Sequence, residues 1–270
     1  MQRYGQNPDA QQKLIDAFPK FIDTIQAKFA GFDVHIMVID SDWQWGMKDC
    51  DPVGCLATNG NGCLLKGVNN DLFIPDYPCG VYSKLTKDEC YTTMGAGVIF
   101  NAGYAAANVP CAVDGGRRYV TGQQSELKKT FSCMARVGES GGTRIGEPIV
   151  AAVGPYLNSE GGCNAGFLRP DALLMITTVT SAIDNASAGT PEQWADTVLT
   201  AKGGNQNAVI VLGIGKWGGD PSDCQTPVCR FVRMFPFHKY GDTSEPDYGD
   251  HFAAAVDLVD EACAAFTPPG

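Results

Sequence analysis

Residues 132–148 read SCMARVGESGGTRIGEP, a short apolar segment followed by four glycines interleaved with Glu139, Ser140 and Thr143. Apolar residues then recur with helical spacing from Ile149 to Leu157. A glycine-rich turn that leads into a helix presents backbone N–H groups together with hydroxyls. That combination suits an anion, a metal-bound carboxylate or a reacting carbonyl, so this stretch is the first candidate site.

Three interpretations of the glycine-rich turn compete. In one it is a metal-binding loop that uses the Thr143 hydroxyl. In the second it is a nucleophile elbow, because residues 138–142 fit the pattern G-x-S-x-G around Ser140. In the third it is a plain loop, since short matches rich in glycine and serine are common by chance.

The bulk composition limits the function classes. The chain has 270 residues, 44% of them hydrophobic, which is enough for one large domain with a real core. Its net charge of −10 argues against nucleic acid and anionic membrane surfaces, since both need a basic face. No apolar run approaches the roughly 18 residues that a membrane-spanning helix needs.

Strands and helices alternate along the chain. Apolar runs predict strands at 33–40, 117–120, 171–180 and 208–214. Helical periodicity, capping residues and breakers predict helices at 7–31, 125–137, 149–158, 190–204, 228–237 and 252–266. This alternation is typical of an α/β domain with a mostly parallel sheet and helices on both faces, whose site lies at the carboxyl ends of the strands.

Residues 43–116 differ in character from the rest of the chain. Six of the eleven cysteines lie there, among many Gly, Asn, Asp and Pro residues, and we expect a disulfide-held insertion within a single domain of residues 1–270. We expect Cys133 to pair with Cys163, and Cys263 to pair with Cys224 or Cys229. The pairing of the six cysteines within the insertion stays open. Disulfides indicate a secreted or cell-envelope protein.

Three segments together resemble the von Willebrand factor A domain, of the kind found in bacterial cell-envelope proteins. Gly141-Gly142-Thr143-x-x-Gly146-Glu147 is similar to the family's Gly-Gly-Thr loop. Residues 164–173 are similar to the lead-in to its fourth strand, and residues 247–263 to its final helix. The resemblance covers about residues 7–42 and 117–266, and it implies a three-layer Rossmann-like fold.

The resemblance implies a metal-ion-dependent adhesion site. In the family a hard cation takes oxygens from an Asp-x-Ser-x-Ser motif after the first strand, from the Gly-Gly-Thr loop and from an acid after the fourth strand. Thr143 matches, and Asp184 lies near the place of the acid. The Asp-x-Ser-x-Ser motif and its strand are missing, so we expect a degenerate site that holds no Mg²⁺ or Mn²⁺ unless that strand is restored.

The missing strand carries a structural expectation as well. In the family this first strand is central, so its loss would leave a gap between two halves of the sheet. We expect the strand and a signal sequence to lie upstream of Met1.

A serine hydrolase is the alternative function. Ser140 would be the nucleophile, Asp184 the orienting acid and His251 the base, in the chain order of α/β-hydrolases, with His238 as another candidate base. The sequence before Ser140 predicts an amphipathic helix rather than the buried strand that an elbow needs. We therefore expect a non-enzymatic recognition or adhesion domain, without cofactor, whose partner is an unidentified protein or cell-surface ligand.

Overall fold

Three parallel strands lie at the centre of the computed structural model, which describes residues 8–29, 31–40, 62–65, 72–75, 89–91, 93–100, 110–137, 144–217, 223 and 225–267. They are β5 (Leu174–Thr180), β6 (Val209–Gly215) and β7 (Phe237–Asp242), in the order β5-β6-β7. Leu174 pairs with Val209 and Ile210 with Phe237. Every residue of β6 is buried, as its uninterrupted apolar sequence predicts for a central parallel strand.

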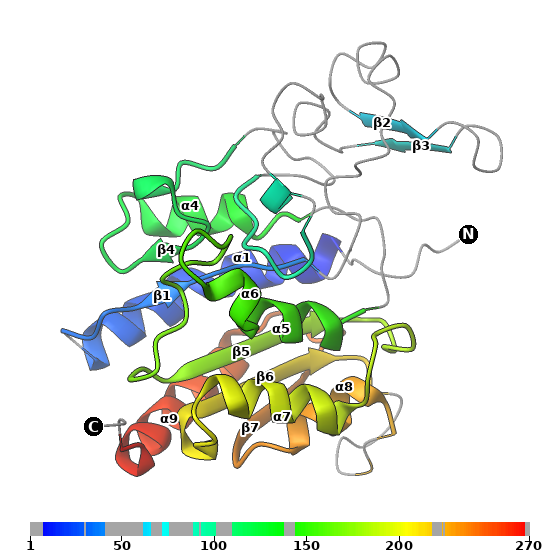
Figure 1. Ribbon diagram of the computed structural model, residues 1–270. Coiled ribbons are helices and arrows are strands. Elements are labelled where there is room, and N and C mark those ends of the chain that lie inside the picture. The colour runs from blue at the N-terminus through cyan, green and yellow to red at the C-terminus, as the bar shows by residue number, and fades with distance from the viewer. Residues whose placement is uncertain are drawn as a thin grey trace.

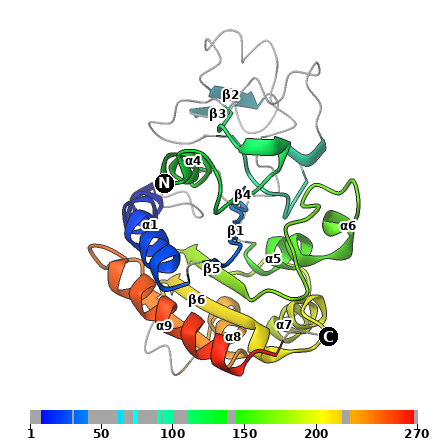
Figure 2. The same cartoon turned by 90° about the vertical axis from the view of Figure 1, so that its left-hand side faces the viewer.

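Helices cover both faces of this sheet (Figures 1 and 2). On one face, α5 (Gly146–Val153), α7 (Pro191–Ala201) and α8 (Pro227–Arg233) share a core that includes Trp194, Val211 and Phe231. On the other face, α1 (Pro8–Lys28) and α9 (Gly249–Ala265) pack against Leu212 and Ile214. We call these three strands and their helices the parallel half of the molecule.

A smaller sheet lies beside the parallel half. It consists of β1 (His35–Ile36) and β4 (Val120–Thr121), which pair antiparallel. Backbone bonds extend it, from Gly122 N–H to Val34 O and from Val98 N–H to Val38 O, both at 2.8 Å. Its core joins α1 to α4 (Leu127–Met134), where the rings of Phe18 and Phe131 stack with centroids 3.5 Å apart. We call β1, β4 and α4 the small half.

The remaining elements are short. Strands β2 (Gly62–Leu65) and β3 (Leu72–Pro75) pair antiparallel apart from both halves (Figure 1). Helix α6 (Pro155–Asn158) follows α5. The 3₁₀ turns are η1 (Glu89–Tyr91), η2 (Asp114–Gly116) and η3 (Gln206–Ala208). No helix in the described ranges is both long and apolar enough to span a bilayer.

Two disulfides attach the insertion to the rest of the chain, and both correct the expected pairings. Cys90 bonds Cys163, and Cys111 bonds Cys133. Cys133 therefore does not pair with Cys163, because its helix α4 packs on the segment that carries Cys111. These bonds are typical of an oxidising compartment.

The cysteines near the carboxyl end also differ from expectation. Cys263 is a free thiol on α9, so the predicted bond to Cys224 or Cys229 is wrong. Cys229 is nevertheless disulfide-bonded. Cys263 belongs instead to the apolar contact between α1 and α9, beside Phe29 and Val256.

Other elements differ from the predicted ones in extent. The helix predicted over 149–158 is two helices, because Gly154 takes an extended conformation and Pro155 starts α6. Strand β7 follows α8 where the sequence predicts a helix to residue 237. The helix predicted from residue 190 is confirmed, and Thr190 and Gln193 form a capping box at its start in α7.

Candidate functional site

The Asp184 carboxylate is the most heavily bonded group at the carboxyl edge of β5. Its side chain is buried, with 2% of its surface exposed. Oδ2 accepts hydrogen bonds from the backbone N–H of Ile145 at 2.7 Å, the N–H of Gly146 at 2.8 Å and the Ser187 hydroxyl at 2.6 Å. Oδ1 accepts from the N–H groups of Ala186 at 3.3 Å and Ser187 at 3.0 Å.

These bonds make Asp184 a cap for the first turn of α5. A carboxylate offers about four lone-pair positions, so five donors leave it no open acceptor site in this arrangement. Its negative charge also favours the positive end of the helix dipole. Asp184 thereby fixes the loop after β5 to the helix that follows the glycine-rich turn.

Further contacts close the same junction. Ser187 Oγ accepts from Glu147 N–H at 3.0 Å, and Glu147 Oε2 accepts from Ala188 N–H at 3.3 Å and pairs with Arg144 at 2.8 Å. Gly146 packs so closely on Trp194 that a Cβ there would lie 2.2 Å from the indole ring. Only glycine fits at this helix start without moving Trp194.

The predicted metal ligand Thr143 and the predicted nucleophile Ser140 both belong to the glycine-rich turn. Both lie outside the described residues. Within the described ranges, no three His, Cys, Asp or Glu side chains are grouped so as to hold a metal ion. The metal role of Thr143 and Asp184 stays a prediction.

The histidines of the hydrolase alternative have other partners. His251 Nε2 contacts Glu245 Oε2 at 2.9 Å, and its ring packs over Gly241 of β7, where a Cβ would lie 2.6 Å away. His238 Nδ1 contacts Phe235 O at 2.6 Å. Asp184 therefore orients the start of α5 and neither of these imidazoles.

The turn after β7 also carries an acid. Asp242 Oδ1 accepts from the N–H of Ser244 at 2.7 Å, and this bond lowers the pKa of Asp242. Trp217 donates its indole N–H to Gly241 O at 2.9 Å, closing the edge between β6 and β7. These hydrogen bonds are typical of a rigid turn after β7.

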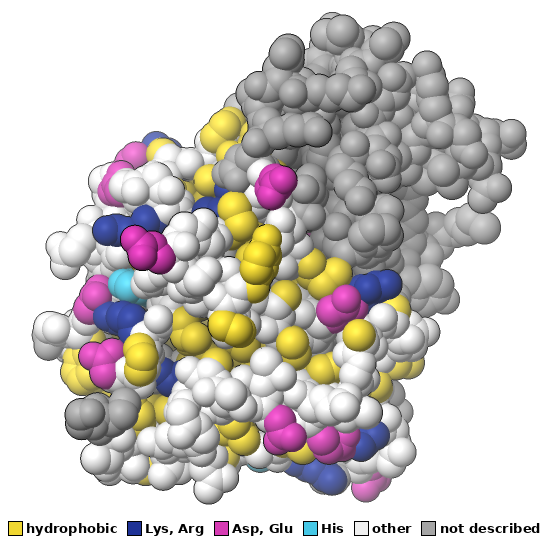
Figure 3. Space-filling view, viewed as in Figure 1, with side chains coloured by type: hydrophobic (Ala, Val, Ile, Leu, Met, Phe, Trp, Pro, Cys, Tyr) yellow, Lys and Arg dark blue, Asp and Glu magenta, His cyan; other side chains and the backbone are white. Residues whose placement is uncertain are grey.

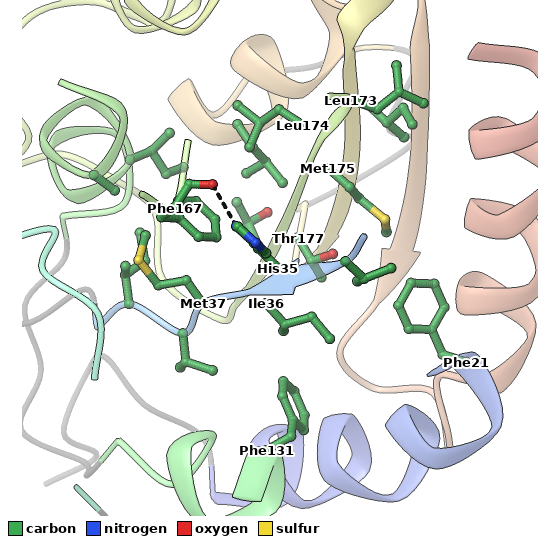
Figure 4. A pocket seen from close by; sticks show the side chains of 18 of the residues that line it. Phe21, His35, Ile36, Met37, Phe131, Phe167, Leu173, Leu174, Met175 and Thr177 are labelled. Atoms are coloured by element: carbon green, nitrogen blue, oxygen red, sulfur yellow. Dashed lines mark hydrogen bonds between the residues drawn. The ribbon is translucent and has the colours of Figure 1, made fainter. Parts of the chain in front are cut away.

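A cavity of about 730 Å³ lies between the two halves of the molecule. It runs along the segment Asp33–Asp40 on one side and the segment 171–181 on the other. Figure 4 shows Met37 of the first segment and Met175 and Thr177 of β5 at its walls. We call this cavity the slot.

Groups at one end hold the slot's walls together. Arg169 pairs with Asp33 Oδ2 at 2.7 Å and donates to Asp33 O at 2.6 Å. His35 Nδ1 contacts Phe167 O at 3.2 Å (Figure 4). Lys202 donates to Arg169 O at 2.5 Å, and burial lowers the pKa of this lysine. Since Asp33 and Arg169 precede the two walls, both walls begin at this end.

Sequence reasoning missed the Ser187 hydroxyl. Asp184-x-x-Ser187 is a spacing at which a carboxylate caps its own loop, so Ser187 had a readable signal. The slot lies between β1 and β5, in the place where the resemblance led us to expect a gap between two halves of the sheet. No protein-family model, curated protein or solved structure matches the chain.

Proposed function

We propose that the chain is a non-enzymatic recognition domain related to the von Willebrand factor A type, acting in a secreted or cell-envelope protein. The observation that carries the proposal is the parallel sheet β5-β6-β7 with a braced loop at its carboxyl edge. In α/β sheets this edge is where ligands bind. Asp184 holds the loop there without being exposed to a substrate.

The contacts of the titratable groups favour binding over catalysis. An acyl-transfer triad needs an acid bonded to its imidazole, which is in turn bonded to the nucleophile. Asp184 bonds α5 and Ser187, while His251 bonds Glu245. Labelling of Ser140 by a serine-directed fluorophosphonate would contradict the proposal.

The metal site is proposed to be degenerate. Thr143 matches one family position and Asp184 lies near another, and they supply one neutral hydroxyl and one carboxylate. A Mg²⁺ ion needs anionic oxygens in octahedral geometry to offset its dehydration. Recognition at this edge would therefore depend on side chains of the loop rather than on a bridging ion.

Ile183 is the side chain to test. It lies beside Asp184 in the braced loop and is 58% exposed, whereas Tyr156 on α6 is 77% exposed and away from that loop. Exposed apolar side chains of this size are anchor candidates in interfaces. On the face shown in Figure 3, hydrophobic side chains form a band across the middle, over α5 and α6. Tyr156 on α6 is therefore a strict control, because it is also an exposed apolar side chain in an apolar part of the surface.

The experiment compares immobilised wild-type protein with Ile183→Glu and Tyr156→Glu in an extract of the source organism's envelope. We expect wild type and Tyr156→Glu to retain the same partners, identified by mass spectrometry, and Ile183→Glu to lose them. Equal recovery on all three proteins would place recognition elsewhere. Circular dichroism checks that both variants keep the fold.

A further inference from the structure

Helix α1 has side chains in the cores of both halves of the molecule. Phe18 stacks on Phe131 of α4 in the small half, as described above. Phe21 packs on Phe252 of α9 in the parallel half, where the ring centroids are 4.9 Å apart. Figure 2 shows α1 between α4 and α9. The apolar part of the helix thus joins the halves, and the polar residues of its first turn make further contacts with each.

The first turn of α1 holds the segment that follows α4. Gln11 Oε1 accepts a hydrogen bond from the backbone N–H of Val137 at 3.3 Å. Gln12 Oε1 accepts one from the guanidinium of Arg136. Val137 is buried in a small core with Val98, and residues 136–137 directly precede the glycine-rich turn in the sequence. The two glutamines therefore fix the chain where it leaves the small half.

The next residue of the same turn holds the turn after β7. Lys13 Nζ donates to Thr243 O at 3.1 Å and lies 5.8 Å from the ring centroid of Tyr248, which is fully buried. Thr243 O and the N–H of Ser244 belong to one planar peptide group. That N–H donates to Asp242 Oδ1, so Lys13 and Asp242 hold the same peptide group from its two sides.

Helix geometry explains how three consecutive residues reach two separate segments. Successive residues of an α-helix are about 100° apart around its axis, so Gln11 and Lys13 project in nearly opposite directions. The first four N–H groups of a helix have no acceptor within it, and helix ends open more readily than helix centres. The position of this turn therefore depends on contacts that come from both sides.

We propose that the first turn of α1 is a two-state coupling element between residues 136–137 and the turn after β7. When the turn is docked it holds both segments, and when it opens it releases both. Coupling between two places requires an element whose equilibrium both of them bias, and each segment here favours the docked state of the same turn. A ligand that orders either segment would thus also order the other.

This inference concerns regulation of the proposed recognition edge and rests on that function for its purpose. Residues 136–137 lead into the glycine-rich turn, and the turn after β7 lies at the carboxyl edge of the sheet. The coupling itself is measured on the free chain. A failure of the coupling is therefore distinguishable from a failure of the Ile183 experiment.

Hydrogen exchange at two amides of the full chain tests the coupling. The reporters are the amides of Val137 and Ser244, one in each segment. Lys13→Met keeps the apolar stem and removes the donor, so the Ser244 amide should exchange about fivefold faster and the Val137 amide should follow by a similar factor. The double variant with Gln11→Ala and Gln12→Ala should likewise speed exchange at both amides.

Matched variants exclude other causes. Lys20→Met removes an exposed lysine from the same helix, and Val198→Ala lowers overall stability from α7, on the opposite face of the sheet. Neither variant should change the exchange of the two reporter amides. Lys13→Arg keeps a donor for Thr243 O and should restore slow exchange at both.

Two results would overturn the proposal. If each variant of the first turn speeds only the amide of its own segment, the contacts of α1 are independent of each other. If Val198→Ala speeds both amides as much as Lys13→Met does, the two segments open only with the whole fold, and the first turn of α1 has no separate open state.

Discussion

The parallel half and the small half are built from similarly apolar sequences but are buried very differently. All seven residues of β6 are buried, whereas the segment Val34–Ile39 is only half-buried along its whole length. Strand β5 is intermediate, with Met175, Ile176 and Val179 half-buried. An apolar run predicts that a strand will be buried. Whether it is buried depends on the elements that pack against it. The slot is where that cover is missing.

The largest effect we expect comes from the disulfide that joins the insertion to the turn after α6. Replacing Cys90 and Cys163 together by Ser opens a loop with a sequence separation of 73 and should lower the free energy of unfolding by about 4 kcal/mol. The Cys111–Cys133 bond, which joins the insertion to α4, should contribute about 3 kcal/mol. Urea unfolding measures both values.

Cys263→Ser is the control for these variants, because this thiol is free. It should change the free energy of unfolding by about 0.5 kcal/mol or less. If the Cys90 and Cys163 double variant changed the free energy of unfolding as little, the stability of the fold would not depend on this covalent link.

The second prediction compares a covered and an uncovered strand. Leu212→Ala on β6 removes a fully buried side chain and should cost about 3 kcal/mol, whereas Met175→Ala on β5 should cost about 1 kcal/mol because it borders the slot. Urea unfolding again gives both values. Equal costs at the two positions would mean that Met175 is as well covered as Leu212 and that the slot is already filled.

The third prediction concerns pH and the parallel half. Burial raises the pKa values of Tyr240 and Tyr248 to about 12, from an ordinary value of 10.0. Between pH 10 and 12 the unfolded chain loses these protons while the folded chain keeps them. The free energy of unfolding therefore falls as pH rises through this window, by about 1 kcal/mol per tyrosine after solvent screening.

Absorbance at alkaline pH follows this titration directly. Tyr240→Phe and Tyr248→Phe should each remove one late-titrating group and flatten the loss of stability. A single titration step for all tyrosines near pH 10 would contradict the burial of this pair.

The smallest expected effect is that of metal. With one neutral hydroxyl and one saturated carboxylate, about 5 mM Mg²⁺ or Mn²⁺ should leave the melting temperature of the wild type unchanged, although a tight site would add roughly 4 kcal/mol at that excess. A rise of several degrees in melting temperature that disappears in Thr143→Ala would show that a working metal site exists at the carboxyl edge of the sheet.

The sequence predicted the parts of the fold that depend on local signals. An uninterrupted apolar run located β6, a run of apolar and β-branched residues located β5, and Thr190-Pro191 with Gln193 located the start of α7. Strand β7 was missed because Phe237–Asp242 contains His, Lys, Tyr and Asp and has an apolar residue only at its start. It therefore lacks the apolar pattern by which a strand is predicted. It is a strand because β6 offers it a partner, and that partner is remote in sequence.

The site was predictable only in part. Asp184 could be named from its place after a strand, but its use as a cap depends on Ile145 and Gly146, which lie nearly forty residues earlier (separations of 39 and 38). The cysteine pairings failed for the same reason, since α4 brings Cys133 to Cys111 rather than to Cys163. Spacing along the chain does not encode these contacts.

The Cys90–Cys163 disulfide also determines how tension would pass through the molecule. A load applied to the chain between Asp40 and Cys90 enters the fold at two places. One is Asp40, which continues directly into the segment that carries β1. The other is Cys90, whose sulfur atom passes the load to Cys163 in the turn after α6. The β1–β4 ladder has only two residue pairs, so the Asp40 side should yield before the covalently linked Cys90 side.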